Sequence, residues 1–425
     1  MAGRRPARAQ RLRYRYHFTD FVSGTPLATL PLQDASLSEV LSGASDGSGV
    51  VSLTDPAVRR HDPFRATVPR RTICWAERIV LDPQNRVVSS TYPWAGVVMR
   101  RERSRSSRSL ALSMVTIPGY FARRIVRNQT HVGVDKFSIF RAILDDAIAW
   151  PYILTSSRPT PGELDPPAPL DGMPYLAPGR YDFADYGVGL PLSGVTADRT
   201  YLESDLRTAL EEFRSLAGSG DGFDWRMYPV RVGDAPGVTG RFRMELALGY
   251  PRLGRIAPGD LVWSDDENDA DAGQLLDYKI TEDGAGVNNR LIALGEGSGP
   301  TQLRTEVWAG SVGRDEWGYG YPLWEASVRG STSELRTQAY LDASARGAMI
   351  AGLASEVTLS GVTVRGDLMP TLDRWNVGDD GTFRIGAATT GTPTTIVGQI
   401  VARTIEPAQP GRPERVTLDL QGATA

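Results

Sequence analysis

The sequence is poor in the side chains that build metal centres and covalent cross-links. Its 425 residues include one cysteine, Cys74, and three histidines, His17, His61 and His131. A single thiol excludes a disulfide scaffold and any cysteine-based zinc or iron–sulfur site within one subunit. The histidines are far apart and offer no paired-ligand spacing. We therefore expect no metal and no cofactor.

Long apolar runs are also missing. No run approaches the ~18 residues that a membrane-spanning helix needs, and the start at Met1–Arg5 lacks the apolar core of a signal peptide. We expect neither a membrane span nor export by the usual route. Apolar side chains make up 41% of the chain, which at roughly 150 residues per domain suits two to four domains.

Lysine is nearly absent, because Lys136 and Lys279 stand beside 45 arginines. This bias indicates a GC-rich genome rather than a function. Charge is segregated: the net charge is +11 over residues 1–150, −11 over 151–300 and −3 over 301–425. The pattern predicts complementary faces, which orient association more than they supply affinity.

The first part of the chain is predicted to be rich in strands. Short apolar stretches separated by turn residues indicate an N-terminal barrel or sandwich over residues 1–130. Apolar periodicity predicts a helix at 135–149. Prolines then crowd residues 158–179, so residues 131–198 form a helix plus a Pro-rich arm, whose role the sequence leaves open.

The middle is predicted to be α+β over residues 199–330. Thr200-x-x-Glu203 resembles a capping box and predicts a helix over 200–217, and strict alternation predicts a strand at 241–248.

The last part is predicted to be a helix followed by a second small barrel, over residues 331–425. An Ala-rich helix at 332–351 opens at Ser331-x-x-Glu334, and short strands separated by turns follow. The predicted fold class is a β-dominated, multidomain α+β protein, with two small β-barrels flanking an α+β middle.

Three motifs that carry chemistry elsewhere favour structural interpretations here. Gly43–Gly47 matches G-x-S-x-G, but a loop entering a strand follows and no histidine is marked as its base, which favours a surface turn. The acidic run Asp265–Asp271 has no glycine in EF-hand register, which favours a solvated loop over an isolated cation site. Gly295–Gly299 is a weak dinucleotide fingerprint.

Arginine runs and an aromatic segment are the strongest interaction features. The acidic total charge and the lack of a nucleic-acid-binding motif favour a charged protein–protein face over specific nucleic-acid recognition. The aromatic segment 308–324 suits either a glycan-binding loop or anchors at an assembly interface. The candidate interaction residues are Arg4, Arg5, Arg8, Arg11, Arg13, Arg100, Arg101, Arg103, Arg105, Trp308, Trp317 and Trp324.

Several phrases occur in an order that resembles a known family. They are Asp221–Arg226, Leu246–Gly254, Asn288–Gly297, Pro322–Glu325 and Trp375–Asp380, with Phe18–Asp20 and Gly24–Leu32 near the start. This order resembles the minor tail proteins of actinobacterial long-tailed (siphovirus) phages, which are akin to tail-tip (baseplate) hub proteins.

The resemblance implies a structural virion protein at the tail tip, assembled in the host cytoplasm, and not an enzyme. It implies a homotrimeric hub in which two barrels per subunit alternate around a pseudo-sixfold collar below the tail tube. The implied partners are further copies, a distal tail or tube-side ring protein, the tape-measure protein, and other minor tail, spike or fibre proteins. The alternatives are a tail-associated cell-wall hydrolase and a receptor- or glycan-binding tip protein.

Overall fold

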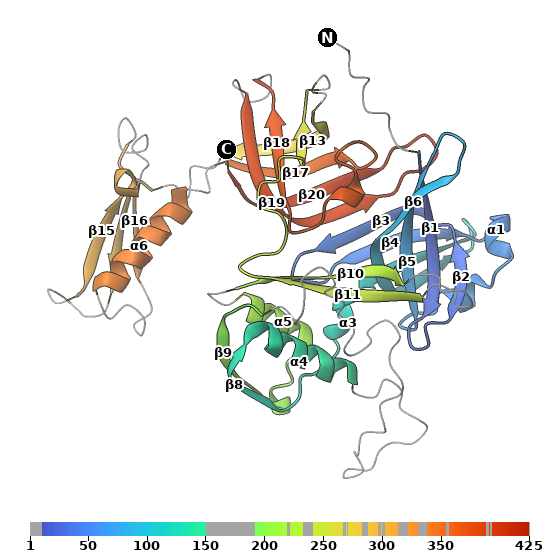
Figure 1. The fold of residues 1–425 in the computed structure, drawn as a ribbon, viewed down its shortest axis with the longest axis horizontal. Coiled ribbons are helices and arrows are strands. Elements are labelled where there is room, and N and C mark those ends of the chain that lie inside the picture. Colours follow the sequence, from blue (N-terminus) through green and yellow to red (C-terminus); the bar gives the residue numbers. More distant parts are fainter. Residues whose placement is uncertain are drawn as a thin grey trace.

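Strands predominate over helices in the structure. The computed structural model describes residues 11–149, 192–218, 222–232, 241–266, 269, 271–282, 288–295, 299, 302–312, 322–329, 338–353, 357–387, 391 and 393–424. These residues form an N-terminal curved β-sheet unit and a closed C-terminal β-barrel, which we call together the two barrels, a helical layer below them and a small α/β unit set apart, as Figure 1 shows.

The N-terminal unit is a curved, antiparallel seven-stranded sheet in the order β3-β4-β7-β6-β5-β1-β2. Its first strand shows why it forms: Tyr14, Tyr16 and Phe18 point into the core, while Arg11 and Arg13 alternate with them and are exposed. The strands are β1 (Arg11–Asp20), β2 (Pro26–Leu30), β3 (Gln33–Val40), β4 (Asp46–Ser52), β5 (Thr72–Leu81), β6 (Val87–Ser104) and β7 (Ser109–Thr116). The short helices are α1 (Pro56–Arg59), α2 (Pro63–Ala66) and α3 (Pro118–Phe121).

The C-terminal unit is a closed six-stranded barrel. Its order is β18-β12-β13-β17-β20-β19, and a second pairing of β18 with β19 closes the ring. Trp263, Trp375 and Phe383 fill its interior, with the rings of Trp263 and Phe383 stacked. The strands are β12 (Val262–Ser264), β13 (Gly273–Glu282), β17 (Val357–Arg365), β18 (Asp380–Ile385), β19 (Thr394–Glu406) and β20 (Arg415–Thr424), with a single turn η5 (Leu372–Arg374).

The two barrels share one continuous sheet of thirteen strands. β19 of the C-terminal barrel pairs antiparallel with β3 of the N-terminal unit, from Ala402 opposite Val40 to Ile405 opposite Leu37. Buried apolar side chains from both units belong to one cluster, among them Phe18 and Leu37 of the N-terminal unit and Trp375 and Ile405 of the C-terminal barrel. The two barrels are therefore joined by backbone hydrogen bonds and a shared core, and not by a flexible linker.

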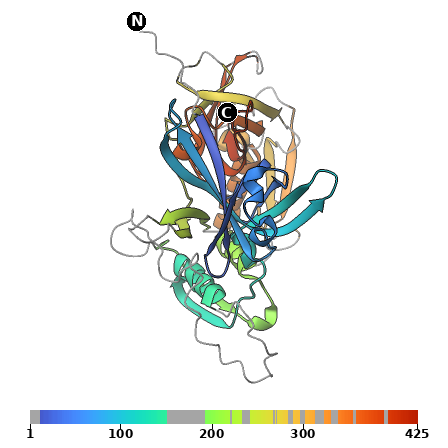
Figure 2. The same cartoon turned by 90° about the vertical axis from the view of Figure 1, so that its right-hand side faces the viewer.

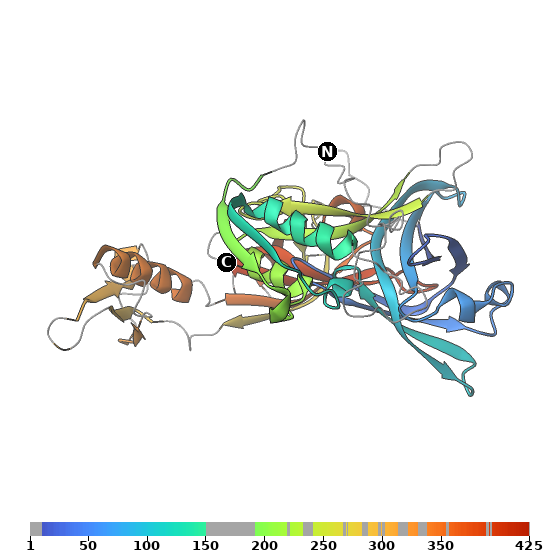
Figure 3. The same cartoon turned by 90° about the horizontal axis from the view of Figure 1, so that it is seen from below.

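A helical layer covers one face of a long two-stranded ribbon (Figures 1 and 3). Trp225 of the ribbon packs with Phe140 and Phe213 of the helices, and Phe242 stacks on Trp75 of β5. The elements are β8 (Gln129–Asp135), α4 (Lys136–Ala149), β9 (Thr196–Tyr201), η1 (Glu203–Asp205), α5 (Ala209–Ala217), β10 (Asp224–Val232) and β11 (Arg241–Gly249).

A small unit, which we call the satellite, is inserted between two neighbouring strands of the C-terminal barrel. β13 ends and β17 begins side by side, with Glu282 opposite Val357, and the satellite lies between them in sequence. Helix α6 packs on one face of a three-stranded sheet through Leu341, Ala345 and Met349. The elements are β14 (Arg290–Leu294), β15 (Arg304–Trp308), η3 (Ala309–Val312), β16 (Glu325–Arg329) and α6 (Gln338–Leu353).

The predicted fold class is confirmed, as are the helix at 135–149 and the strand at 241–248. The helix predicted over 200–217 begins later, at Ala209, and residues 196–201 form β9. The capping box that forms is Thr208 with Glu211, because Leu206 adopts a left-handed conformation that ends the preceding turn. Gly218 caps the helix as expected.

The C-terminal barrel also needs strands from outside its predicted range. β12 and β13 lie within residues 199–330, which the sequence assigns to the middle, yet they complete the barrel. The predicted helix at 332–351 corresponds to α6, and its proposed opening at Ser331 and Glu334 lies outside the described residues. The Pro-rich segment 158–179 lies outside them as well.

Candidate functional site: the junction of the two barrels

Buried charge gathers where the two barrels and the ribbon meet. Glu39 of β3 and Arg403 of β19 face each other across the seam, with Arg403 Nη2 2.7 Å from Glu39 Oε2. Arg226 of β10 reaches the same carboxylate, with Nε 3.6 Å from Oε1. The Arg403 guanidinium also stacks over Trp375 and donates to its carbonyl oxygen. One carboxylate thus joins three elements from three parts of the chain.

This cluster carries an excess of positive charge. Arg226 and Arg403 are both buried, and Glu39 is the carboxylate they share. Burial lowers the pKa of Arg226, although the charge of Glu39 opposes that effect. Among the described residues, Nε and Nη1 of Arg226 have no hydrogen-bond partner. Buried donors without partners are costly, so this arginine is poised to bind an acceptor.

A second buried network locks the barrels together. Arg78 of β5 is fully buried and donates through Nε and Nη2 to both oxygens of Glu414, at 3.0 and 3.1 Å, and through Nη2 to Gly366 O at 3.0 Å. Tyr14 donates to Glu414 at 2.5 Å, and Asp373 approaches Arg78 Nη1 at 3.3 Å. Burial, followed by the charge of Glu414, holds the pKa of Tyr14 well above its usual value. Here the charges are matched and hydrogen-bonded, unlike those at Arg226.

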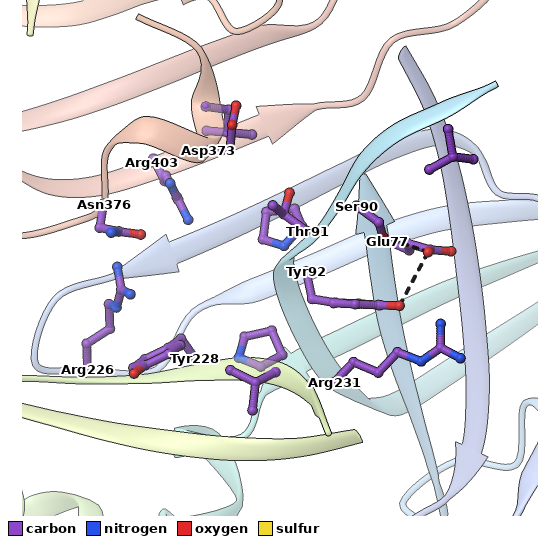
Figure 4. A pocket seen from close by; sticks show the side chains of 15 residues that line it. Glu77, Ser90, Thr91, Tyr92, Arg226, Tyr228, Arg231, Asp373, Asn376 and Arg403 are labelled. Carbon is purple, nitrogen blue, oxygen red and sulfur yellow. Dashed lines mark hydrogen bonds between the residues drawn. The ribbon is translucent and has the colours of Figure 1, made fainter. Parts of the chain in front are cut away.

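A pocket of about 630 Å³ opens between these two networks (Figure 4). Strand β6 supplies one wall, the ribbon strand β10 the opposite wall, and the C-terminal barrel the end. Figure 4 places the guanidinium groups of Arg226 and Arg403 beside the Asn376 amide at one end. The pocket is also lined by polar side chains of Glu77, Tyr92, Tyr228, Arg231 and Asp373.

The carboxylates of the pocket already have partners. Glu77 accepts from His17 at 2.9 Å and from Ser90 at 2.7 Å. Burial alone would raise the pKa of Glu77, but these hydrogen bonds and the nearby positive charges lower it to about 2. Asp373 pairs with Arg78. Glu77 is therefore ionised at neutral pH, and both carboxylates already have partners, which makes them poor general acids or bases.

The described residues do not group the side chains of a cysteine nucleophile or a metal centre. Cys74 is fully buried, and burial raises the pKa of its thiol, so it is inert as a nucleophile. Among the described residues, no three histidine, cysteine or acidic side chains group as metal ligands. None of the described helices is long and apolar enough to cross a membrane.

The G-x-S-x-G motif is a turn with a packing role. Ser45 Oγ donates to the Ser38 carbonyl at 2.6 Å. Gly47 is needed because a Cβ there would lie 2.4 Å from the Trp94 ring, which is buried beneath it. The acidic run is likewise structural: Asp265 accepts from Tyr278 at 2.6 Å, and the loop joins β12 to β13 as predicted.

Some of the predicted basic residues contact other side chains of the chain, and most of those described are exposed. Arg101 donates to the Thr67 carbonyl at 3.3 Å, and Arg103 lies over the Phe64 ring at 4.5 Å, so both hold the β6–β7 hairpin to α2. Arg100 pairs with Glu102 on the hairpin, which stands away from the barrel in Figure 2. The exposed residues are Arg11, Arg13, Arg100, Arg103 and Arg105. Arg4, Arg5, Arg8 and Trp317 lie outside the described residues.

Two of the predicted tryptophans, Trp308 and Trp324, lie on the satellite. Trp308 and Trp324 are 47% and 61% exposed. Arg290 lies over the Trp308 ring at 5.2 Å, and its backbone N–H donates to the Trp324 carbonyl at 3.1 Å. Trp308 ends β15 and Trp324 directly precedes β16, so both exposed tryptophans lie next to the start of β14.

Sequence reasoning missed Glu39, Arg226 and Arg403. Each lies on a strand where alternation assigns charged side chains to a wet face. Only the pairing of β19 with β3, and the ribbon lying across it, buries that face. No local pattern in the sequence marks such a long-range contact.

No protein-family profile matches the chain, and no curated protein matches it. Among solved structures, the 43 kDa tail protein of prophage MuSo2 from Shewanella oneidensis is similar over 95% of this chain and 97% of its own, with 10% identity and a TM-score of 0.50. A tail protein from Neisseria meningitidis MC58 matches over 96% of each chain, with 13% identity and a TM-score of 0.46. The chain has a tail-hub-like fold.

Proposed function

We propose that this chain is a structural subunit of a phage-type tail, which forms a homotrimeric hub at the tail tip. The observation that carries the proposal is the fusion of two barrels into one thirteen-stranded sheet, in a fold similar to a prophage tail protein along its whole length. Three such subunits would present six barrels, which suits contact with a sixfold tube. The satellite and the helical layer would then face the spike or fibre proteins.

Charge supports association between copies. The basic first third includes the exposed hairpin arginines Arg100 and Arg105, and the middle of the chain is acidic. Opposite faces of this kind orient neighbouring subunits in a ring. The siphovirus setting, the tube-side ring and tape-measure partners, and the location at the virion tail tip belong to this proposal.

The decisive experiment is a mass measurement of the purified chain. Mass photometry over a concentration series should show monomer converting to trimer, and negative-stain images should show threefold rings. A strict monomer at all concentrations, also when mixed with the tube-side ring protein, would contradict the hub.

The two exposed tryptophans of the satellite support a second candidate, a receptor- or glycan-binding tip protein. Trp308 and Trp324 present ring faces of the kind that stack on sugars. Fluorescently labelled protein should then bind host cell walls, and Trp308→Ala with Trp324→Ala should abolish that binding. A cell-wall hydrolase finds no support, because the described carboxylates of the pocket are already paired.

A further inference from the structure

The pocket between the barrels has a polar end that its own residues leave incomplete. Arg226 lines this end and is 8% exposed; its guanidinium lies over the Tyr228 ring at 4.7 Å, and its Nε is 3.6 Å from Glu39 Oε1. Arg403, also buried, lies close enough that its charge lowers the pKa of Arg226 further. Two buried guanidinium groups therefore share the single carboxylate of Glu39.

Other carboxylates nearby do not neutralise this excess of positive charge. Glu77 is bound by His17 and Ser90, and Asp373 by Arg78. Asp379 accepts from the Arg255 backbone at 2.7 Å and from its guanidinium at 3.3 Å. An added anion would pair with Arg226 and make charge-assisted hydrogen bonds, which are the strong ones.

The rest of the pocket is suited to a peptide. Tyr92 and Pro93 of β6 form one side wall, and Tyr228 and Pro229 of β10 form the other. Flat aromatic and proline surfaces of this kind bind extended, proline-containing segments. A volume of about 630 Å³ also exceeds what an inorganic ion would fill.

We propose that this pocket binds an acidic peptide segment of a partner, with one Asp or Glu carboxylate on Arg226 and apolar neighbours between the tyrosine–proline walls. Arg226 shares Glu39 with Arg403, and this excess of positive charge beside apolar walls selects such a segment over a bare oxyanion. The binding needs no assembly, so it does not depend on the hub being trimeric.

The test is calorimetric titration of the full chain with a capped synthetic hexapeptide, Pro-Leu-Glu-Pro-Asp-Leu, which sets two carboxylates among proline and leucine. We expect saturable one-to-one binding, at least tenfold weakening when both acids are changed to amides, and at least tenfold weakening by Arg226→Gln. Equal binding of the acidic and amide peptides would overturn the proposal.

Inorganic phosphate is the second ligand. If phosphate binds through Arg226 and the peptide does not, the site takes a free oxyanion and the peptide proposal fails. If neither phosphate nor the peptide binds, the proposal is also overturned. Weaker binding of phosphate, displaced by the peptide, supports it.

Arg226→Gln is a fair variant, because it leaves Glu39 paired with Arg403 and removes the unmatched charge. It should fold and unfold at an unchanged or higher urea concentration. Pro93→Ala, which trims the β6 wall, should weaken the peptide but not phosphate. Arg13→Gln, exposed on β1, is the matched control and should change neither. Trimer formation, measured separately by mass, reports on the hub and not on this pocket.

Discussion

Two buried arginines at the barrel junction differ in how their charge is balanced. Arg78 is buried but matched by Glu414, whereas Arg226 is buried and shares its counter-ion. Removing one partner of a matched buried pair leaves a bare charge in a poorly solvated place, which costs far more than the pair contributes.

Arg78→Met should therefore destabilise the protein by about 3–5 kcal/mol. The isolated Glu414 carboxylate stays buried, at 0% exposure, with only Tyr14 still donating to it among the contacts described above. Urea unfolding followed by tryptophan fluorescence measures the change. Arg86→Met, which breaks an exposed pair with Asp82, is the control and should cost less than about 0.5 kcal/mol.

Adding Glu414→Gln to Arg78→Met should recover part of the loss, since no buried charge then remains unpaired. Additive losses from the two substitutions would show that the residues act independently.

Glu77 should make stability depend on acid pH. Its pKa is lowered from 4.5 to about 2 in the folded protein, so it favours the folded state above the unfolded pKa. That contribution is lost as the pH falls from about 4.5 to about 2. Urea midpoints measured across this range should fall more steeply for the natural protein than for Glu77→Gln. Parallel curves would mean that the hydrogen bonds from His17 and Ser90 do not favour the ionised carboxylate.

At the scale of elements, close packing explains a motif that looks catalytic. Gly47 and Gly49 lie on β4, and each faces the core over a large side chain. Gly47→Ala would place Cβ 2.4 Å from the rigid Trp94 ring, whereas Gly49→Ala meets the flexible Leu32 at 3.1 Å. We expect Gly47→Ala to cost about 1–3 kcal/mol and Gly49→Ala distinctly less, in the same unfolding assay. Equal costs would remove the packing account of the motif.

The satellite should be removable. Its neighbours in the barrel, Glu282 and Val357, are already paired strand ends. Replacing residues 283–356 by Asn-Gly should close β13 and β17 as a tight hairpin and leave the barrel folded. Circular dichroism and the urea midpoint check this. Loss of cooperative unfolding would mean that the barrel needs the satellite.

Elements with strong local patterns could be predicted from the sequence, and those made by distant pairing could not. The strand at 241–248 alternates strictly, and α4 has a clear apolar face, so both were found. β12 has three residues and gains its place only by pairing with β13 and β18. The start of α5 was misplaced because two capping patterns lie eight residues apart, and the sequence alone does not rank them.

The candidate site was less predictable than the fold. Arg101 and Arg103 are expected at an interaction surface, which stays a prediction, and in the structure they contact α2 and its C-terminal cap. The charged cluster at the end of the pocket joins Glu39 of β3, Arg226 of β10 and Arg403 of β19. No short-range sequence pattern encodes the approach of these three strands.

At the scale of the whole molecule, segregated charge should control association. If opposite faces bring copies together, raising the salt from about 0.01 M to about 1 M shortens the Debye length from about 30 to about 3 Å and should favour the monomer. Arg100→Ser with Arg105→Ser should reproduce part of that shift at low salt without changing the unfolding midpoint. Mass photometry measures both. Salt-independent oligomers would point to an apolar interface.

The continuous sheet also has a mechanical consequence. Because β19 and β3 run alongside each other, a pull that separates the barrels along the strand direction loads their backbone hydrogen bonds in parallel, in shear, and does not open them one at a time. The two halves should therefore pass a displacement from one to the other with little lost to bending. A tether between independent domains would absorb it.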